Sequence, residues 1–468
     1  MRCLRLREPL ALRGWDRLPH AIQDLRTGAT SVLGPDEFTV LALCNGSFDL
    51  DSPLVPDAYR AIADAALKRG LVQACAEGER PLGYQAYRRA PCRFIRVAHW
   101  SITGRCNLSC RHCFMSAPHA RFGELPLDRC LDIVRQLAEA NIAQVTLTGG
   151  EPLVRPDFFR IVDALLERQI TIVQVYSNGL RVDADLLDGF ESRGIKPEFS
   201  LSFDGLGWHD WLRGADGAET AVIAAMERLG ARGFQMGVET ALHTLNRHTL
   251  PATMGLLQRL GVGHWKTNPA ADGGEWLKEG GRYNLSVDEL YRIYLDFIPV
   301  YRAAGAPLGI MLGGFFACAK GAQDYRIPGA RFDGTAASRR RTVCQSARTT
   351  MYIGADGTLL PCMPMSGLTL AEPMPNLTQM PLAQALSDST YLKTIDLRLE
   401  ELLAANGRCA ACEYRFRCGG GCRSAALQTS RHYLGVDEYT CRFFSGGYEQ
   451  RVHDAWHGAA GEPPHAHG

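Results

Sequence analysis

Three closely spaced cysteines supply the most specific chemical pattern in this sequence. They follow one another as Cys106-x3-Cys110-x2-Cys113. Three thiolates at this spacing can bind three irons of a cubane iron–sulfur cluster, which leaves the fourth iron open to a small chelating molecule. A zinc site is the alternative, for which His112 or His119 would supply the fourth ligand.

The other cysteines fall into two classes. Five are isolated and are expected to be small buried hydrophobic residues: Cys3, Cys44, Cys75, Cys92 and Cys130. Eight lie in the C-terminal part of the chain: Cys318, Cys344, Cys362, Cys409, Cys412, Cys418, Cys422 and Cys441. Because no cysteine lies between Cys130 and Cys318, two cysteine-rich centres flank a cysteine-free body.

The overall composition excludes several classes of function. Lys and Arg number 51 and Asp and Glu number 50, so the net charge of +1 argues against nucleic acid as a main partner. No run of about 18 apolar residues could span a membrane, and the start of the chain lacks the apolar segment of a signal peptide. We therefore expect a cytoplasmic protein, in which disulfides are rare and 16 cysteines point to metal or cluster binding.

The body between the two centres is expected to alternate strands and helices. Apolar, β-rich segments predict six strands at residues 94–102, 144–147, 171–176, 198–203, 236–242 and 264–268, with amphipathic helices between them. This alternation favours an α/β fold with a parallel sheet, either open or closed into a barrel. Ligands bind at the carboxyl ends of the strands in such folds. Because polar motifs follow several of these strands, the sequence predicts one shared site.

Residues 1–88 are expected to form a separate unit. A hairpin around Thr27-Gly28 and helices over residues 35–44 and 56–69 are typical of a small winged-helix-like domain. This unit is either a structural appendage or a partner-binding module that adds an extended peptide to its sheet. At the other end of the chain, residues 453–468 are expected to be a disordered tail.

The motifs of the body resemble those of radical S-adenosylmethionine (SAM) enzymes. The resemblance covers about residues 94–270 and consists of the three cysteines, then Gly149-Gly150-Glu151-Pro152, Ser177-Asn178-Gly179 and Ser202-Phe203-Asp204-Gly205. It implies a partial (β/α)6 TIM barrel and a [4Fe-4S] cluster whose open iron chelates the amino and carboxylate groups of SAM. It also implies that SAM is cleaved reductively and that the 5′-deoxyadenosyl radical abstracts a hydrogen atom from the substrate.

The resemblance also implies roles for individual residues. Those expected to bind SAM are His112, Gly149, Gly150, Glu151, Ser177, Asn178, Ser202 and Arg213. Glu151 would meet the methionyl amine, whereas Arg213, with His209, would position SAM or the substrate. Three acidic residues near strand ends are candidates for accepting a proton: Asp204, Asp210 and Glu239. Each of the three could equally be a helix cap or a salt-bridge partner.

The C-terminal cysteines resemble the seven-cysteine SPASM extension of radical SAM enzymes, with a zinc ribbon as the alternative. The matching pattern is Cys344, Gly357, Cys362, then Cys409-x2-Cys412-x5-Cys418-x3-Cys422 and finally Cys441. The resemblance implies two auxiliary [4Fe-4S] clusters, and hence three clusters in all. The outer one would be bound by Cys409, Cys412, Cys418 and Cys441. The inner one, nearer the substrate, would be bound by Cys344, Cys362 and Cys422.

One ligand is missing from this scheme. Three clusters, one of them with SAM on its open iron, need eleven protein thiolates, whereas the two patterns supply ten. Either Cys318 is the last ligand of the inner cluster or one iron of that cluster stays open, and we favour the open site slightly. An open iron could bind a substrate thiolate and hold a peptide cysteine beside the radical site.

The N-terminal unit resembles the peptide-recognition element (RRE) of ribosomal-peptide maturases, which is related to the small peptide chaperone of pyrroloquinoline quinone biosynthesis. The chain is thus expected to divide into this unit (1–88), a radical SAM core (89–312), a SPASM region (313–452) and the tail. These resemblances imply an enzyme that binds the leader of a precursor peptide, takes electrons from a ferredoxin or flavodoxin, and cross-links the peptide oxidatively. A thioether is favoured over a carbon–carbon bond. The alternatives are an oxidase of the anaerobic sulfatase-maturating type, which forms formylglycine, and a non-catalytic leader-binding scaffold with zinc ribbons.

Overall fold

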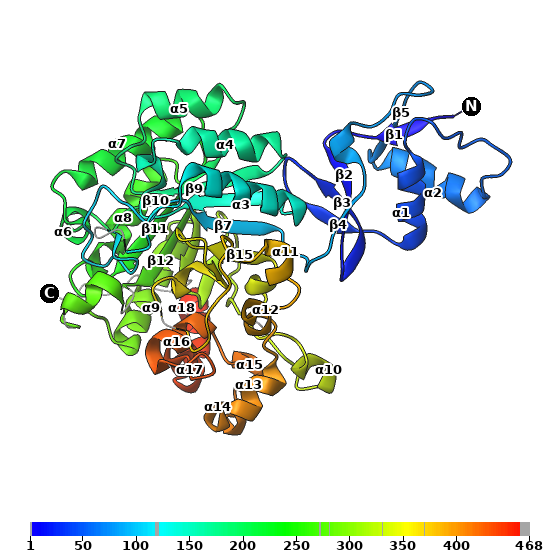
Figure 1. The fold of residues 1–468 in the computed structure, drawn as a ribbon. Coiled ribbons are helices and arrows are strands. Elements are labelled where there is room, and N and C mark those ends of the chain that lie inside the picture. The colour runs from blue at the N-terminus through cyan, green and yellow to red at the C-terminus, as the bar shows by residue number, and fades with distance from the viewer. Residues whose placement is uncertain are drawn as a thin grey trace.

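The computed structural model describes residues 2–117, 121–270, 273–279, 281–329, 331–368 and 370–458. His119, considered above as a zinc ligand, and residues 459–468 of the expected tail lie outside the described residues. Figure 1 shows an N-terminal unit beside a central sheet that is covered by helices, with the C-terminal helices gathered below it. Within the described residues, no helix is long and apolar enough to cross a membrane.

One sheet of ten strands forms the centre of the protein. Its strand order is β14-β13-β12-β11-β10-β9-β8-β7-β15-β16. The six expected strands are all present: β7 (Val97–Ser101), β8 (Gln144–Thr148), β9 (Thr171–Ser177), β10 (Glu198–Ser202), β11 (Met236–Leu242) and β12 (His264–Pro269). They follow one another in chain order and pair in parallel, which confirms the α/β fold with strand–helix alternation.

Four further strands extend the sheet at its two edges. β13 (Gly309–Leu312) pairs in parallel with β12, and β14 (Phe316–Cys318) then pairs antiparallel with β13. At the other edge, β15 (Thr350–Ile353) pairs in parallel with β7, and β16 (Leu359–Leu360) pairs antiparallel with β15. Between β15 and β16 lies Gly357, whose φ of +87° is left-handed and therefore favours glycine. Chain from the cysteine-rich C-terminal segment thus becomes part of the central sheet.

Helices cover the outer face of the parallel strands. They are α3 (Leu127–Glu139), α4 (Phe158–Glu167), α5 (Ala184–Glu191), α6 (His209–Arg213), α7 (Ala218–Ala231), α8 (Leu250–Arg259) and α9 (Val287–Ala303). In α3, the apolar stripe of Ile133, Val134 and Leu137 is buried in the core shared with the sheet. α9 begins at a capping box in which Ser286 and Glu289 each accept a hydrogen bond from the other's backbone N–H.

The N-terminal unit has a small core of its own. Its elements are β1 (Leu4–Leu6), β2 (Leu10–Trp15), β3 (Leu18–Asp24), β4 (Thr30–Val32), α1 (Pro35–Leu43), α2 (Asp57–Lys68), β5 (Val72–Ala74) and β6 (Arg88–Ala90). One sheet has the order β4-β3-β2-β6, and β1 pairs with β5. The expected hairpin is present between β3 and β4, with Gly28 in its turn at a φ of +68°. Val40, Leu41 and Ala63 pack in a hydrophobic cluster separate from the barrel core.

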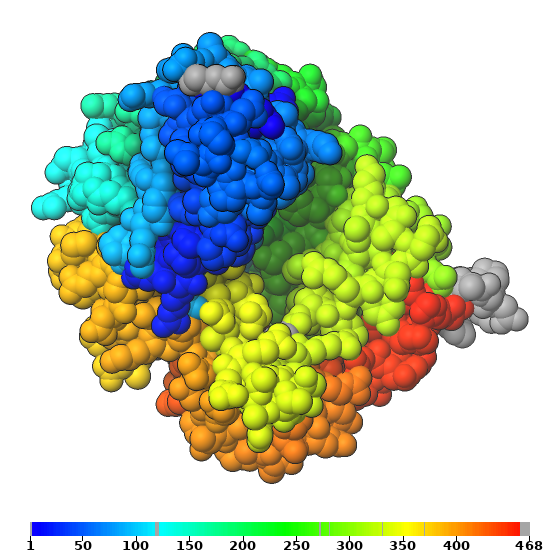
Figure 2. All heavy atoms as spheres, turned by 90° about the vertical axis from the view of Figure 1, so that its right-hand side faces the viewer, coloured from blue at the N-terminus to red at the C-terminus, as the bar shows by residue number. Residues whose placement is uncertain are grey.

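The N-terminal unit contacts the barrel where the parallel strands begin. The indole Nε1 of Trp15 donates a hydrogen bond to the carbonyl of Ala140, which follows α3, at 3.0 Å. Thr171, the first residue of β9, donates its hydroxyl to the carbonyl of Leu25 at 2.6 Å. Figure 2 views this side and shows a hollow between the blue N-terminal unit and the yellow-green part of the chain, floored by green barrel residues. The unit therefore lies at the end of the barrel away from the carboxyl ends of the strands.

Short helices make up the C-terminal segment. They are α10 (Ala336–Arg339), α11 (Leu382–Ala385), α12 (Thr390–Ile395), α13 (Leu399–Ala405), α14 (Gly407–Ala411), α15 (Arg415–Cys418), α16 (Arg423–Ser430), α17 (Glu438–Ser445) and α18 (Tyr448–Gly458). Short 3-10 turns lie at η1 (Gly83–Gln85), η3 (Pro152–Val154), η4 (Arg247–Thr249), η5 (Gly274–Glu279), η6 (Ser346–Arg348) and η7 (Met363–Met365).

The expectation of a disordered tail from residue 453 is wrong as far as Gly458. Residues 453–458 are helical because Val452 and Trp456 are buried, with Trp456 packed against the ring of Phe316.

Candidate active site and cluster sites

The first cysteine group occupies the loop that follows β7. Cys106, Cys110 and Cys113 lie between the carboxyl end of β7 and α3, and each is partly exposed. Burial of its thiol raises the pKa of Cys106 to about 12, and the nearness of Cys110 and Cys113 contributes to this rise. A cationic iron site stabilises thiolates, and it would relieve the mutual repulsion of these groups. The three residues therefore fit the donor set of a cluster with one open iron.

Two glycines bring the end of β8 against this loop. Gly150 donates its N–H to the carbonyl of Thr103 at 2.8 Å, and Glu151 donates its N–H to the carbonyl of Arg105 at 2.9 Å. A Cβ on Gly150 would stand 2.2 Å from the carbonyl oxygen of Arg105, and one on Gly149 would stand 2.4 Å from that of Thr103. Any side chain at either position would push the cysteine loop away, so the backbone contact requires glycine.

Glu151 joins the ends of β8 and β9. Its buried carboxylate accepts hydrogen bonds from the Ser177 hydroxyl at 3.0 Å and from the N–H groups of Asn178 at 2.7 Å and Leu153 at 3.2 Å. Burial raises the pKa of Glu151 to about 7, although these hydrogen bonds oppose the rise. Asn178 also lies 3.9 Å from the sulfur of Cys106. The structure thus brings three residues predicted to bind SAM together beside the first cysteine, with the Glu151 carboxylate engaged in bracing the strand ends.

A buried ion pair lies behind the same loop. Arg213 on α6 donates from Nε to Oδ2 of Asp204 at 2.7 Å, and its Nη1 lies 3.9 Å from the sulfur of Cys110. Although burial opposes ionisation, Arg213 holds the pKa of Asp204 well below its usual range. His209 Nδ1 accepts the N–H of Asp204 at 3.1 Å. Burial lowers the pKa of the neighbouring His112 to about 3. Asp204 is therefore a fixed anion within this cluster, poorly suited to take up a proton during catalysis.

Asp210 has a local structural role. Its carboxylate accepts hydrogen bonds from the N–H groups of Gly217 at 2.7 Å and Glu219 at 2.6 Å. These N–H groups belong to the start of α7, where backbone donors have no partner within the helix. Asp210 therefore caps α7, which is the alternative that its sequence position left open.

Glu239 lies in a polar cluster on the inner face of the barrel. Its carboxylate accepts hydrogen bonds from the Tyr176 hydroxyl and from Lys266 Nζ, both at 3.3 Å, although Tyr176 is on β9 and Lys266 on β12. The side chains of Glu239 and Lys266 are 27% and 35% exposed. Ser202, predicted to bind SAM, is the register partner of Glu239 on the neighbouring strand. Barrel interiors are usually filled by apolar side chains, so this charged, partly exposed cluster is unusual. We call it the polar chamber and treat it as the candidate substrate site.

Sequence reasoning missed Lys266 and Tyr176. Both lie at inward-facing positions of short strands. Their hydroxyl and ammonium groups come close to Glu239 only because β9, β11 and β12 curve around one interior. His99 on β7 belongs to the same neighbourhood, since burial and the charge of Lys266 lower its pKa. The available signal was a polar residue at an inward position of a strand that is otherwise apolar.

The second set of cysteines separates into two groups. Burial raises the pKa of the Cys362 thiol, and Cys422 and Cys344 raise it further because they lie close by. Burial raises the pKa of Cys418 to about 12, with smaller contributions from Cys409 and Cys441. A small cavity is lined by the sulfur-bearing residues of this second group: Cys409, Cys412, Cys418 and Cys441. Below, Cys344, Cys362 and Cys422 are called the inner group, and the four cysteines around the cavity are called the outer group.

Cys318 interacts with Tyr301 and Asp324, whereas Cys362 is influenced by Cys344 and Cys422. Cys318 is buried in β14, and its sulfur lies 3.4 Å from the carbonyl of Ala319 and 3.5 Å from that of Asp324. β14 stands at one edge of the ten-stranded sheet, whereas β15 and β16, which adjoin Cys344 and Cys362, stand at the other. Of the five isolated cysteines, Cys75 is partly exposed. The other four are buried, namely Cys3, Cys44, Cys92 and Cys130.

The first loop and the inner group flank opposite ends of the barrel. β15 starts where β7 starts, since Thr350 is the register partner of Val97. Cys344 precedes β15, and Cys362 follows the antiparallel β16, so both adjoin the starting end of this strand pair. Cys106 instead follows the carboxyl end of β7. The polar chamber of Glu239 lies between the two ends.

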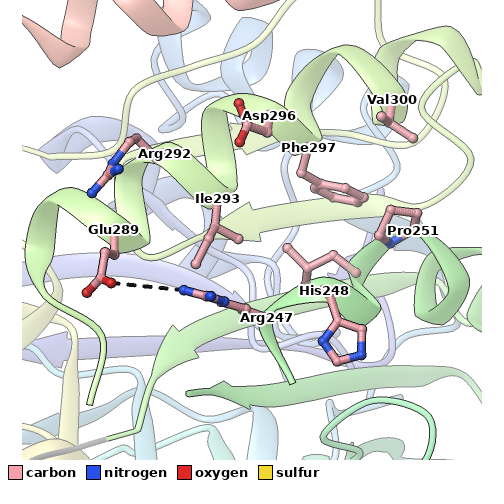
Figure 3. A pocket seen from close by; sticks show the side chains of 10 residues that line it. Arg247, His248, Pro251, Glu289, Arg292, Ile293, Asp296, Phe297 and Val300 are labelled. Carbon is pink, nitrogen blue, oxygen red and sulfur yellow. Dashed lines mark ion pairs between the residues drawn. The ribbon is translucent and has the colours of Figure 1, made fainter. Parts of the chain in front are cut away.

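A larger cavity lies outside this arrangement. It has a volume of about 450 Å³ and is walled by η4, α8 and α9. Figure 3 shows Arg247 directed towards Glu289, with which it forms an ion pair at 3.9 Å, and Ile293 and Phe297 along the wall from α9. None of the described residues predicted to bind SAM or a cluster lines this cavity. It belongs to the outer helical layer.

Comparisons with known proteins agree with this geometry. The family model of the radical SAM superfamily matches residues 100–257. The chain is 22% identical to the AdoMet-dependent heme synthase of Methanosarcina barkeri over 74% of this chain and 95% of that protein. It is 34% identical to the mycofactocin maturase MftC of Mycobacterium ulcerans, over 29% of this chain and 36% of that protein. The solved structure of Streptococcus suis SuiB aligns with a TM-score of 0.63 and 14% identity over 94% of this chain and 100% of that one.

These comparisons identify the barrel rather than the reaction. The alignment with MftC spans about a third of that maturase, and the likeness to SuiB at 14% identity concerns the fold. A radical SAM domain implies one [4Fe-4S] cluster and bound SAM, which the donor set of the β7 loop fits. Residues 100–257 therefore form a radical SAM domain, and the protein is an enzyme.

Proposed function

We propose that the protein modifies a ribosomally made precursor peptide by oxidative cross-linking. The observation that carries this proposal is the polar chamber around Glu239, which lies between the first cysteine loop and the inner cysteine group. Five residues of β7 separate the two ends, or about 16 Å at 3.3 Å per residue. A peptide side chain in this chamber would face the radical from one end and an electron acceptor from the other.

Three cysteine sets hold the proposed cofactors. The first loop binds the cluster that carries SAM, and the inner and outer sets bind the two auxiliary clusters. When bound, these groups supply a radical that abstracts one hydrogen atom and a route by which one further electron leaves. Loss of the second hydrogen as a proton completes the oxidation. Glu239 is the proposed proton acceptor, because Asp204 and Asp210 are engaged in structural contacts.

The peptide substrate is supported by the N-terminal unit. SuiB, whose fold covers 94% of this chain, has been solved with its precursor peptide SuiA, and MftC is named a maturase. In the N-terminal unit, β4 is an edge strand with Val32 65% exposed, so it can accept an extended leader peptide. The unit lies where the barrel strands begin, beside the hollow of Figure 2, through which a peptide would reach the chamber.

One comparison favours another substrate, and the same fold would allow a second alternative. The heme synthase of Methanosarcina barkeri aligns over 95% of its length, which favours a tetrapyrrole substrate. An oxidase that forms formylglycine would use the same barrel and the same three clusters. Neither alternative explains an N-terminal unit with its own core and an exposed edge strand.

A thioether is the proposed cross-link because the inner set has three cysteines. The contacts of Cys318 are with Ala319, Asp324 and Tyr301, so we propose that it is not a ligand and that one iron would stay open to a substrate thiolate. The variant Cys318→Ala tests this point. It should retain all its iron and unchanged cluster spectra, whereas the control Cys362→Ala should lose iron. Loss of one cluster from Cys318→Ala would instead make Cys318 the missing ligand.

Anaerobic reconstitution tests the proposed function. We expect about twelve iron and twelve sulfide per chain, because each cubane holds four of each, and formation of 5′-deoxyadenosine from SAM and dithionite. With a precursor peptide encoded beside the gene, the product should weigh two mass units less than the peptide. Absence of 5′-deoxyadenosine would contradict the proposed function, and an iron content below about eight atoms per chain would contradict three clusters. Turnover of a tetrapyrrole without peptide modification would select the alternative.

A further inference from the structure

The ion pair behind the first cysteine loop is fully engaged. Asp204 is completely buried, and the Arg213 side chain is 10% exposed. Oδ1 of Asp204 accepts the N–H of Ala241 at 2.9 Å, and Oδ2 accepts Arg213 Nε at 2.7 Å. Burying two charges is unfavourable unless they are paired and hydrogen-bonded, and this pair is both. The position of the guanidinium is therefore tightly fixed.

Helix α6 holds this guanidinium against the cysteine loop. Arg111 donates its N–H to the carbonyl of Leu212 at 2.9 Å. A Cβ on Gly214 would stand 2.7 Å from the carbonyl oxygen of Ser109, so the two backbones are in close contact. These contacts lie on both sides of Cys110 in the sequence. They place the adjoining Nη1 of Arg213 3.9 Å from its sulfur.

We propose that Arg213, held by Asp204, sets the reduction potential of the cluster bound at Cys110. This inference rests on the proposed function, because it assumes a cluster at the first cysteine group. Reduction adds one negative charge to a cluster, and a fixed cation or hydrogen-bond donor at a ligand sulfur stabilises the reduced form. The pair is too deeply buried for salt to screen it. Asp204 offsets part of this field, so the two residues act on the potential with opposite signs.

A second arginine provides a matched contact in a different environment. Arg408 Nη2 lies 3.7 Å from the sulfur of Cys441, which belongs to the outer set. Its side chain is 62% exposed and forms an ion pair with Glu438 at 2.8 Å. Water and salt weaken charges at such a site. Arg408 should therefore affect its cluster much less than Arg213 affects the first one.

Redox titration of the reconstituted protein, monitored by electron paramagnetic resonance, tests the inference without any substrate. The variants are Arg213→Met, Asp204→Asn, the double variant, and Arg408→Met as the control. The first cluster is recognised by the change of its signal when SAM is added. At a fixed potential, Arg213→Met should lower the ratio of reduced to oxidised first cluster at least tenfold, which corresponds to about 59 mV. Asp204→Asn should raise this ratio, and the double variant should give a ratio between those of the two single variants. Arg408→Met should change the ratio of reduced to oxidised form by no more than twofold, both for the first cluster and for the outer cluster.

A purely structural role for the pair would give a different pattern. It would lower the melting temperature of both single variants, while the ratio of reduced to oxidised first cluster at a fixed potential stayed within twofold of wild type. This result would overturn the inference. If Arg213→Met failed to fold around an unpaired Asp204, the sign of the shift in Asp204→Asn would still decide. Failure of the proposed function is distinguishable, because the wild-type protein would then show no SAM-sensitive cluster signal.

Discussion

The indole of Trp15 donates a hydrogen bond to the carbonyl of Ala140, which links the N-terminal unit to the end of α3 in the barrel. Trp15 is fully buried and belongs to the barrel core rather than to the core of its own unit. The unit is therefore built into the enzyme at the end where the strands begin. A peptide held on its edge strand would stay at a fixed distance from the chamber.

Replacement of Trp15 by alanine should weaken this attachment. Truncation of a fully buried tryptophan costs about 3–5 kcal/mol, so urea unfolding should begin at a lower concentration and protease should cleave between the unit and the barrel. The control Leu54→Ala removes a side chain that is 91% exposed and should leave both measurements unchanged. Equal stability of the two variants would contradict the packing described here.

The three cysteine sets should control iron content independently. Replacing Cys344, Cys362 and Cys422 by alanine should remove about four irons and leave 5′-deoxyadenosine formation intact, because the first cluster keeps its ligands. Replacing the three cysteines of the first loop should remove about four irons and abolish 5′-deoxyadenosine. Iron analysis and product chromatography make the comparison, with Cys130→Ala, a buried isolated cysteine, as the control that keeps all its iron.

Gly150→Ala should disable the first loop. The new Cβ would stand 2.2 Å from the carbonyl oxygen of Arg105, so the loop carrying Cys106 must shift. We expect at least a tenfold loss of 5′-deoxyadenosine formation and weaker binding of SAM in equilibrium dialysis. Gly34→Ala is the matched control, because nothing lies within 4 Å of a Cβ at that position and its φ is −68°. Full activity of Gly150→Ala would show that the loop tolerates the side chain.

Glu151 should make the protein less stable as the pH rises. Burial raises its pKa to about 7 from an ordinary value of 4.5, so the folded state binds the proton more tightly than the unfolded state does. Between pH 4.5 and 7 the free energy of unfolding should fall by up to about 3 kcal/mol from this group. Glu151→Gln should lose this decline when urea unfolding is compared with wild type at pH 5 and pH 7. An identical decline in the two proteins would assign it to other groups.

Local sequence patterns were sufficient for much of the fold. The six parallel strands follow from residues close together in the chain. The pairing of β15 with β7 could not be predicted in this way, because no local pattern records which strand lies at a sheet edge. The tail was misjudged for a related reason, since Trp456 is buried by partners on β14.

The candidate site shows the same division. Glycine and cysteine motifs identified the loop and its support, because their spacing is itself the requirement. The acidic residues were harder, since Asp204, Asp210 and Glu239 look alike until their partners are known. Only the curvature of the sheet, which brings Tyr176 and Lys266 to one carboxylate, separates the chamber residue from the two structural ones.

The edge position of β15 has a consequence for folding. More than half of the chain separates Thr350 from its register partner Val97, so the first barrel strand gains its second neighbour only after most of the protein has been synthesised. Contacts of such long sequence separation slow folding and leave an unpaired strand edge open to aggregation in the meantime. A nascent chain that ends before β15 would carry the cysteines of the first loop on an incomplete sheet. Production of the active protein should therefore depend on chaperone capacity and benefit from slow expression at low temperature.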